Sequence, residues 1–531
     1  MRINKNSEVL FIILAAVAVF FLFLCTQSVS ADTADASIFD SEDTDCTQQP
    51  AAAEDISTKC EYIRVGFSDA NKLNNEYEGV PSVGEAGASI TLRCDIGIGG
   101  VYVIFDSTYG KWQISDGKGN AAVYESEYIH QYADITERFG DSADSVTLTF
   151  PEAGARISEI YVLSEGALPD WVQIWEPTLE RADILIVSTH SDDEHLFFAG
   201  VIPYYCAKGY SVAVAYMTEH YESDCRHHER LNGLWKAGVR NYPVFGGIVD
   251  KYSTTLEGAK SNLVYYGNTM QELDAFCVEI LRRFRPKVLM THDFEGEYGH
   301  GQHRLLAASL ARALELSSDA SSFPESADMY GTYDVPKAYF HLYSEGQIVF
   351  NWDTPMQELD GKTPFEVSRE AYLLHYSQNE TWFTDWIFGT SAQPINKAAD
   401  IIEYSPCKFG LYRSTVGADS GIGDIFENVT PYSDVGGNKD STETGASDST
   451  ADSLTADTEP TDSTDTSEHM TESAVSGDAA SSTDNSGQTG DGKLNADATD
   501  GFSGNIIAVF AVVFAAAVGV LAVKLKKKKR S

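Results

Sequence analysis

The pattern of apolar and polar positions divides the chain into segments of different texture. Residues 61 to 168 carry short β-branched or aromatic runs separated by turns rich in Gly, Asn and Asp. The runs lie at 90–92, 101–105, 146–150 and 157–163. Short strands with turn residues between them are typical of an all-β sandwich. We therefore expect a β-sandwich domain over 32–170.

The size and strand spacing of this domain resemble those of the galactose-binding-like modules that precede many carbohydrate enzymes. Trp112 and Tyr128 could stack on sugar rings if they are exposed, although most aromatic residues of a sandwich belong to its core.

From Arg181 to about Phe426 the texture alternates between strand-like and helical segments. Strands are predicted at 184–187, 212–217, 288–291 and 338–343, and a helix is predicted at 270–284, where apolar residues recur at helical spacing. An alternation of strands and helices favours a mostly parallel sheet with right-handed crossovers. The expected fold of 180–426 is therefore a Rossmann-like α/β domain.

The two ends of the chain have compositions of their own. Residues 1–31 combine a basic start with an apolar stretch and a small-residue cleavage site, which predicts a signal peptide. Residues 433–503 are rich in Ser, Thr, Gly and acidic residues, which predicts a disordered stalk. An apolar run at 505–523 precedes a basic tail at 524–531 and predicts one transmembrane helix. The expected location is a single-pass cell-membrane protein with its catalytic domain outside.

Charge and cysteine content narrow the partners. The formal net charge of −41 argues against nucleic acid or an anionic membrane surface as an electrostatic partner. Seven scattered cysteines follow the predicted signal peptide, and none shows Cys-x-x-Cys spacing. A disulfide framework and a cysteine zinc site are therefore not expected.

Candidate chemistry follows two of the predicted strands. The segment THSDDEH places His190, Asp192 and Asp193 directly after the first strand of the α/β region. Ligands at strand ends meet at one edge of an open α/β sheet. His190 and Asp193, three residues apart, could share a divalent metal, while Asp192 stays unligated as a proton acceptor. The alternative is a charged helix cap beside an ordinary loop histidine.

A second strand end favours the metal interpretation. The segment THDFEGEYGHGQH follows the strand at 288–291 and brings His292, Asp293, His300 and His303. Imidazole and carboxylate groups at two strand ends suit a metal site with an open position. Spacing alone leaves open whether His300 or His303 is the ligand.

These motifs resemble the PIG-L/LmbE superfamily of zinc-dependent N-deacetylases, whose pattern is roughly HPDDE followed by GHPDH. An Arg-x-x-Glu helix at Arg226 and Glu229 and a late His-x-Ser-Gln at His375 add to the resemblance, which covers about 180–415. Three departures stand out: Ser191 replaces Pro, Gly301-Gln302 replaces Pro-Asp, and His220 stands where the family has Gly at the pocket rim.

The resemblance implies a set of roles. Zinc or another divalent ion would be held by His190, Asp193 and His303, and Asp192 would be the general base. His300 and Tyr298 would stabilise the developing oxyanion. Arg226, Glu229 and His375 would support or contact the substrate, with ion pairing on helix surfaces as the simpler alternative for these three.

The function expected from this resemblance is removal of the acetyl group from an N-acetylhexosamine unit, of the N-acetylglucosamine type, in an extracellular glycan or glycoconjugate. An alternative is a cell-surface adhesin whose deacetylase-like domain only binds glycans. A third possibility is a metal-dependent hydrolase that acts on another amide or an ester.

Overall fold

The computed structural model describes residues 51–67, 73–74, 76, 78–220, 225–420, 424–433 and 435. The predicted signal peptide, almost all of the predicted stalk, the apolar run at 505–523 and the basic tail lie outside these residues. The predicted membrane location is contradicted, because no helix among the described residues is long and apolar enough to cross a membrane.

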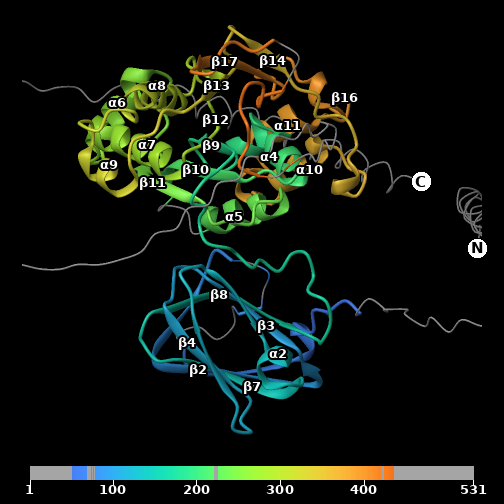
Figure 1. Cartoon of the computed structure of the whole chain (residues 1–531). Helices are drawn as coiled ribbons and strands as arrows, with labels where there is room; N and C mark the ends of the chain where they lie inside the picture. The colour runs from blue at the N-terminus through green and yellow to red at the C-terminus, as the bar shows by residue number, and fades with distance from the viewer. Residues whose placement is uncertain are drawn as a thin grey trace, which may run out of the picture. The chain divides into compact units, whose positions relative to one another are not determined.

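The N-terminal part of the described chain forms an eight-stranded antiparallel sheet (Figure 1). Hydrogen bonds give the order β5-β4-β7-β2-β8-β3-β6, with β1 paired to β2. The strands are β1 (Glu61–Phe67), β2 (Ser82–Ile98), β3 (Gly100–Phe105), β4 (Lys111–Ser115), β5 (Ala121–Glu125), β6 (His130–Asp134), β7 (Ala143–Phe150) and β8 (Ala155–Leu163), with one short helix, α2 (Ile135–Phe139). All four runs predicted from the sequence fall within these strands.

A common apolar core explains why these runs become strands. Ile90 and Leu92 lie two residues apart in β2, and Leu148 of β7 lies directly opposite Ile90. All three side chains are fully buried. Burial at every second position is what a strand with one covered face requires. Trp112 is also fully buried and donates its indole N–H to Gln131 at 2.7 Å. The idea that Trp112 stacks on sugars is therefore wrong.

The second region is an α/β domain built on a seven-stranded sheet of order β11-β10-β9-β12-β13-β17-β14. The strands β11, β10, β9, β12 and β13 run parallel. Strand β17 pairs antiparallel with β13, and β14 pairs antiparallel with β17. The strands are β9 (Ile184–Ser188), β10 (Val212–Glu219), β11 (Val244–Val249), β12 (Val288–Thr291), β13 (Lys337–His341), β14 (Gln347–Val349) and β17 (Lys408–Ser414). A small hairpin of β15 (Gly389–Thr390) and β16 (Gln393–Pro394) stands apart from this sheet.

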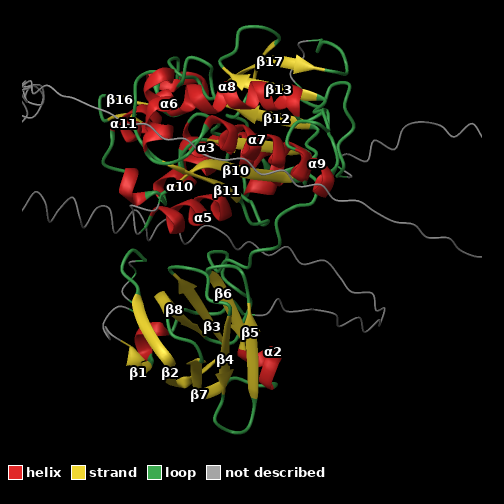
Figure 2. Cartoon of the chain, turned by 90° about the vertical axis from the view of Figure 1, so that its left-hand side faces the viewer, coloured by secondary structure: helices red, strands yellow, loops and turns green. Residues whose placement is uncertain are grey.

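Helices cover both faces of this sheet (Figures 1 and 2). They are α3 (Asp193–Leu196), α4 (Val201–Ala207), α5 (Arg226–Lys236), α6 (Leu256–Tyr265), α7 (Met270–Phe284), α8 (Gly301–Leu316), α9 (Pro324–Tyr330), α10 (Pro364–Leu373) and α11 (Trp382–Phe388). Strand β9 shows why a continuous apolar run is needed. Ile184 and Ile186 join the core beneath α4, α5 and α10, whereas Leu185 and Val187 join the core beneath α6, α7 and α8.

The predicted elements of this domain agree closely with the structure. The helix at 270–284 and the strand at 288–291 have the expected bounds, and the strand expected at 338–343 is β13. Strand β11 was not expected, since Gly246 and Gly247 interrupt its apolar pattern. With β11 included, the five parallel strands all direct their carboxyl ends to one edge of the sheet, where the candidate site lies.

Candidate metal centre

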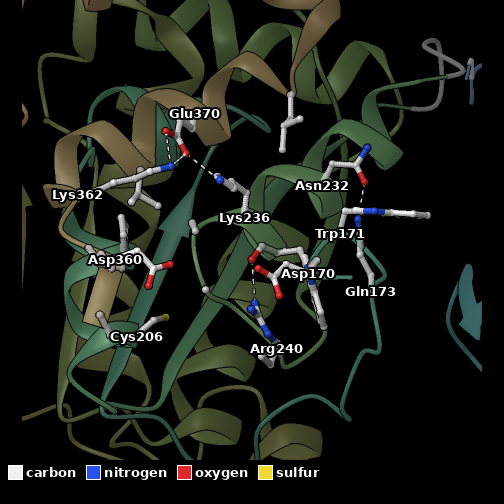
Figure 3. A pocket seen from close by; sticks show the side chains of 18 of the residues that line it. Asp170, Trp171, Gln173, Cys206, Asn232, Lys236, Arg240, Asp360, Lys362 and Glu370 are labelled. Atoms are coloured by element: carbon white, nitrogen blue, oxygen red, sulfur yellow. Dashed lines mark hydrogen bonds and ion pairs between the residues drawn. The ribbon is translucent and has the colours of Figure 1, made fainter. Parts of the chain in front are cut away.

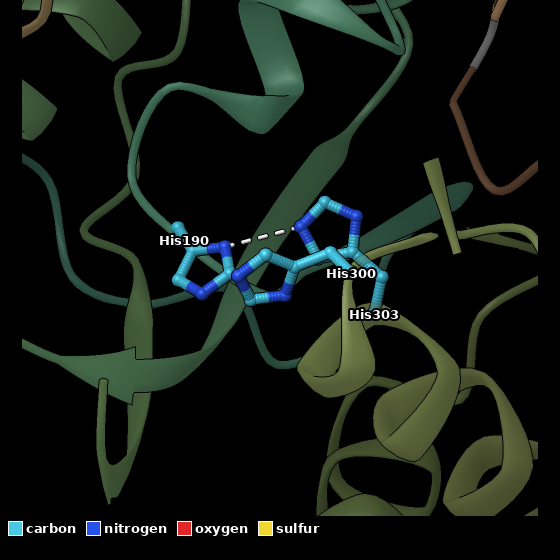
Figure 4. A group of neighbouring side chains, drawn as sticks. All are labelled: His190, His300 and His303. Carbon is cyan, nitrogen blue, oxygen red and sulfur yellow. Dashed lines mark hydrogen bonds between the residues drawn. The ribbon is translucent and has the colours of Figure 1, made fainter. Parts of the chain in front are cut away.

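Three side chains from two strand ends converge on one point at this edge. His190 Nδ1 lies 3.1 Å from Asp193 Oδ2 and 3.1 Å from His303 Nε2. His303 Nε2 and Asp193 Oδ2 are 3.3 Å apart. All three side chains are almost completely buried. Figure 4 shows the rings of His190 and His303 turned toward one another, with His300 beside them.

The donor set fits a divalent ion. Atoms bound to one tetrahedral zinc ion at about 2.0–2.2 Å stand roughly 3.3–3.6 Å apart. The three observed separations are close to that spacing, and two imidazole nitrogens with one carboxylate oxygen are ligands that zinc accepts. Burial alone would lower the pKa of His190, but Asp250 and Asp193 hold it well above its ordinary value, so the local field favours a positive charge.

Glu297 fixes the orientation of the His303 ring. Its Oε2 lies 2.7 Å from His303 Nδ1 and 2.9 Å from His292 Nδ1, and its Oε1 lies 2.6 Å from His341 Nδ1. A carboxylate only accepts, so the proton of each imidazole sits on Nδ1. The lone pair of His303 Nε2 is thereby left to face His190 and Asp193. This is the outer-shell arrangement that orients metal-binding histidines.

His292 also carries its ring proton on Nδ1, but its Nε2 has a different partner from that of His303. Its Nε2 accepts the backbone N–H of Thr189 at 2.9 Å and lies 3.5 Å from Asp193 Oδ2. Because this nitrogen already has a donor, His292 holds the loop after β9 and is not a fourth ligand. The resemblance assigned it no role, and its place at the end of β12 explains why it reaches the same loop.

Gly301 and Gln302, which depart from the family pattern, form hydrogen bonds to the loop after β11. Gly301 donates its N–H to Ser253 O at 2.7 Å, a bond that proline cannot form. Gln302 accepts the N–H of Lys251 at 3.0 Å and donates to Val249 O at 2.9 Å. These bonds fix the loop after β11, and with it Asp250.

Asp250 links two histidines across the centre. Its Oδ1 is 3.4 Å from His190 Nε2 and its Oδ2 is 3.5 Å from His220 Nδ1. His220 Nε2 in turn accepts the backbone N–H of Ser191 at 3.3 Å. His220 was expected at the pocket rim, but the structure buries it against this loop. Asp250 therefore stands behind His190 much as Glu297 stands behind His303.

Asp192 is placed beside the three ligands without joining them. Its backbone has a φ of 124°, a region that non-glycine residues rarely adopt and that is often found at functional sites. The strained peptide is held by its N–H, which donates to Glu194 Oε2 at 2.9 Å. Arg226 Nη2 lies 3.4 Å from Asp192 Oδ1 and also donates to Ser191 O. Burial raises the pKa of Asp192 to about 7, with Arg226 opposing the rise.

His300 has the opposite tautomer to His303. Its Nδ1 accepts the N–H of Gln302 at 3.2 Å at the start of α8, so its remaining ring proton sits on Nε2. Burial, followed by the neighbouring His190 and His303, lowers the pKa of His300 to about 2, so the ring is neutral. A neutral imidazole with a proton on Nε2 donates a hydrogen bond and is not free to bind a metal through that atom. The Tyr298 ring lies beside it, with ring centroids 5.4 Å apart.

Glu229 and His375 are fully buried. Glu229 accepts the backbone N–H and the hydroxyl of Ser377 at 2.7 and 2.6 Å, so it supports the segment after α10. Arg226 lies against the loop after β9 through Ser191 and Asp192. The roles that the resemblance implies for these residues toward a substrate stay predictions.

Two exposed aromatic residues flank the centre. Tyr252 is 63% exposed and its ring centroid lies 5.0 Å from that of His300. Trp382 is 47% exposed and its ring lies 5.4 Å from that of Tyr298. These side chains come from the loop after β11 and from α11. Each therefore presents an exposed aromatic ring close to the candidate centre.

A separate cavity of about 720 Å³ contains none of the predicted site residues (Figure 3). Three of its charged groups form one ion-pair network. Glu370 accepts from Lys236 and Lys362 at 2.8 and 2.7 Å. This cavity does not hold the candidate chemistry.

Part of the chain is similar to known proteins. Residues 185–314 match the family model described as PIG-L: GlcNAc-PI de-N-acetylase. A Catenulispora acidiphila protein described as 1D-myo-inositol 2-acetamido-2-deoxy-alpha-D-glucopyranoside deacetylase 1 is 24% identical over 291 residues, which are 51% of this chain and 88% of that protein. A Thermobispora bispora protein described as the deacetylase of the same compound is 30% identical over 163 residues, 27% of this chain and 54% of that protein.

Among solved structures, the N,N'-diacetylchitobiose deacetylase from Pyrococcus horikoshii is similar at 16% identity and a TM-score of 0.31. The similarity covers 43% of this chain and 84% of that one. Residues 185–314 are thus similar to the PIG-L family, and the relatives named above are described as deacetylases.

The role of Glu297 can be tested by the substitution Glu297→Gln. A glutamine presents an NH₂ group where one carboxylate oxygen accepted an imidazole proton, so the His303 ring loses its fixed orientation. We expect the affinity for Zn²⁺ to fall roughly 10–100-fold, as lost outer-shell partners do, measured by competition with a chromogenic chelator. Glu295→Gln is the matched control, because Glu295 lies in the same loop with its side chain 84% exposed. Equal affinities in both variants would contradict this role.

Proposed function

We propose that this protein is a metal-dependent N-deacetylase that removes the acetyl group from an N-acetylhexosamine unit, of the N-acetylglucosamine type, in a glycan or glycoconjugate. The observation that carries the proposal is the convergence of His190 Nδ1, Asp193 Oδ2 and His303 Nε2 within 3.3 Å of one another. The carboxyl of Asp192, which is not one of these three groups, supplies a base. Zinc is the ion that this donor set suits best.

In this proposal His190, Asp193 and His303 would hold the ion, which would polarise the amide carbonyl and lower the pKa of water toward about 7. Asp192 accepts a proton from the attacking water as the new C–O bond forms. A carboxyl with a pKa near neutrality suits this task, because it can both accept and release a proton.

His300 stabilises the negative charge that develops on the amide oxygen. Its Nε2–H is the donor that the tautomer leaves available, and Tyr298 is the second candidate donor. The proton held by Asp192 then passes to the amine nitrogen as the C–N bond breaks. The products are acetate and the free amine, so water is the only co-reactant.

An acetamide on a sugar fits the surroundings of the centre. Tyr252 and Trp382 present exposed aromatic faces at its entrance, and aromatic rings with one free face suit the apolar face of a sugar ring. The named relatives are deacetylases of an acetamido-glucopyranoside, which supports the same substrate class.

We propose two domains, 32–170 as a β-sandwich and 180–426 as the deacetylase domain. The antiparallel sheet ends with β8 and the α/β sheet begins with β9, which supports this boundary. Binding of carbohydrate by the first domain stays a prediction.

The direct test of the function is acetate release by the purified chain from N-acetylhexosamine oligosaccharides. We expect release that stops when a chelator removes the metal and resumes when Zn²⁺ is added. Sugar-free acetamides of similar size are the control substrates. Binding of the oligosaccharide without acetate release would favour the non-catalytic alternative, and activity confined to sugar-free amides would exclude the sugar substrate.

The substitution Asp192→Asn separates the base from the ligands. The amide cannot accept the water's proton, so we expect kcat to fall roughly 10²–10⁴-fold while the metal is retained. Asp193→Asn, one position along, is the matched control and should lose metal as well as activity. Metal content by mass spectrometry beside the acetate assay gives the answer. A metal-free Asp192→Asn protein would show that the two aspartates have been assigned the wrong way round.

The two histidines of the GHGQH motif should differ in the same way. His303→Ala removes a ligand, so we expect weak metal binding. His300→Ala removes only a hydrogen-bond donor, so we expect normal metal content and a kcat reduced about 10²–10³-fold. Metal titration and steady-state kinetics on both variants distinguish the roles. The reverse pattern would exchange the two assignments and leave the deacetylase proposal in place.

Trp382 tests the sugar platform. With Trp382→Ala we expect KM for an N-acetylhexosamine oligosaccharide to rise roughly 10-fold, the equivalent of about 1.4 kcal/mol of lost stacking, with kcat nearly constant. Trp171→Ala is the control, because Trp171 is similarly exposed at 43% and lies in the separate cavity. A fall in kcat at constant KM would argue against a platform for substrate.

A further inference from the structure

A second cluster of metal-binding side chains lies beside the candidate centre and shares none of its ligands. Glu194 and His195 belong to α3, and His375 follows α10. One potential ligand atom from each of the three lies within 4.8 Å of the others. Glu194 is 1% exposed and both histidines are 0% exposed. Neither histidine has a role in the reaction proposed above.

The histidines of this cluster lack the hydrogen bonds that burial normally demands. Both ring nitrogens of His195 and both of His375 are without a partner. Buried polar atoms are nearly always hydrogen-bonded, and His303, His292 and His341 of the neighbouring centre all satisfy that rule. Two adjacent, fully buried imidazoles with four unpaired nitrogens therefore indicate that the cluster normally contains something else.

Gly233 in α5 lets both rings pack directly against the helix backbone. A Cβ atom at this position would stand only 2.6 Å from His375 Nε2 and 2.7 Å from His195 Nε2, closer than side chains approach one another. Both Nε2 atoms thus approach the same residue, which has no side chain. Glycine is a poor choice for the interior of a helix, so its presence here fits the close approach of the two rings.

The spacing of the third group matches a shared ion better than a hydrogen bond. Glu194 Oε1 lies 3.4 Å from His195 Nε2, close to the separations among His190, Asp193 and His303. The Tyr216 hydroxyl donates to the same oxygen at 2.5 Å and orients it. Burial holds the pKa of His375 well below its ordinary value, so its ring is neutral and carries a free lone pair.

We propose that Glu194, His195 and His375 form a second, buried site for a divalent cation, with zinc the ion that their two nitrogens and one oxygen suit best. The site is structural, because it is closed to solvent. It stands independently of the proposed deacetylase reaction.

The position of the site gives it a clear structural consequence. It joins α3 to the segment after α10, which Glu229 holds through Ser377. The other oxygen of Glu194 accepts the N–H of Asp192. An ion bound to Glu194 would therefore fix the strained peptide that carries the proposed base. This is one step removed from the reacting atoms, so Glu194, His195 and His375 are positioning residues.

Metal stoichiometry tests the proposal on the full chain. After loading with Zn²⁺ and removal of free metal, we expect two equivalents in the wild-type protein by mass spectrometry. His190→Ala should retain one equivalent, in the second site. Gly233→Ala should retain only the ion held by His190, Asp193 and His303, because the new Cβ would collide with both Nε2 atoms and displace the two rings while every ligand residue is kept. Alanine favours a helix more than glycine does, so loss of metal would not follow from a weaker helix.

Gly110→Ala is the matched control, since a Cβ at Gly110 meets no atom within 4 Å, and it should keep both equivalents. Two equivalents in Gly233→Ala would overturn the proposal. One equivalent in the wild type that His190→Ala abolishes would also overturn it, whether or not the other variants fold. One equivalent that survives His190→Ala but not Gly233→Ala would instead support the second site and refute the catalytic metal.

Discussion

Carboxylates shared between histidines are the constraint on which this site depends. Asp193 lies between His190 and His303, Asp250 lies between His190 and His220, and Glu297 lies among His292, His303 and His341. Glu297 and Asp250 need donors because they are buried or partly buried, and a neutral imidazole can give only one proton. The ring orientations and tautomers are therefore fixed together, and the lone pairs of His190 and His303 are left facing one point.

The sheet makes this sharing possible. Five parallel strands end at the same edge, and each contributes to the network: the HSDD segment after β9, His220 after β10, Asp250 after β11, the His292 to His303 segment after β12, and His341 at the end of β13. Residues that are far apart in sequence meet here because a parallel sheet brings strand ends into register. The apolar strands behind them, such as β9 with alternate side chains in two cores, hold the edge rigid.

The sequence predicts the parts of this arrangement that are local. An apolar run followed by a polar segment is visible at β9 and β12, and the ligands of the candidate centre lie in those two segments. The partners that fix them are not visible in the same way. Glu297 lies within the segment THDFEGEYGHGQH, but nothing in the spacing shows that it contacts three imidazoles. Asp250 follows a strand whose two glycines hide its pattern, and it reaches His190 only through the fold.

The choice between His300 and His303 shows the same limit. His300 precedes α8 and His303 lies in its first turn, so spacing alone allows either to be the ligand. The structure distinguishes them by their partners, because Glu297 takes the Nδ1 proton of His303 while a backbone N–H occupies Nδ1 of His300. Likewise, the burial of Trp112, His220 and His375 follows from packing between segments far apart in the chain. A single sequence does not reveal such packing.

The central claim is that His190, Asp193 and His303 bind one divalent ion through specified atoms. Anomalous diffraction at the zinc edge, from crystals of the Zn²⁺-loaded chain, tests it most directly. The account predicts a peak within bonding distance, about 2.0–2.2 Å, of His190 Nδ1, Asp193 Oδ2 and His303 Nε2, with Asp192 outside the coordination sphere. A Zn²⁺-loaded crystal with no peak between these three atoms, or a peak bound by His292 or His300 in place of His303, would contradict it.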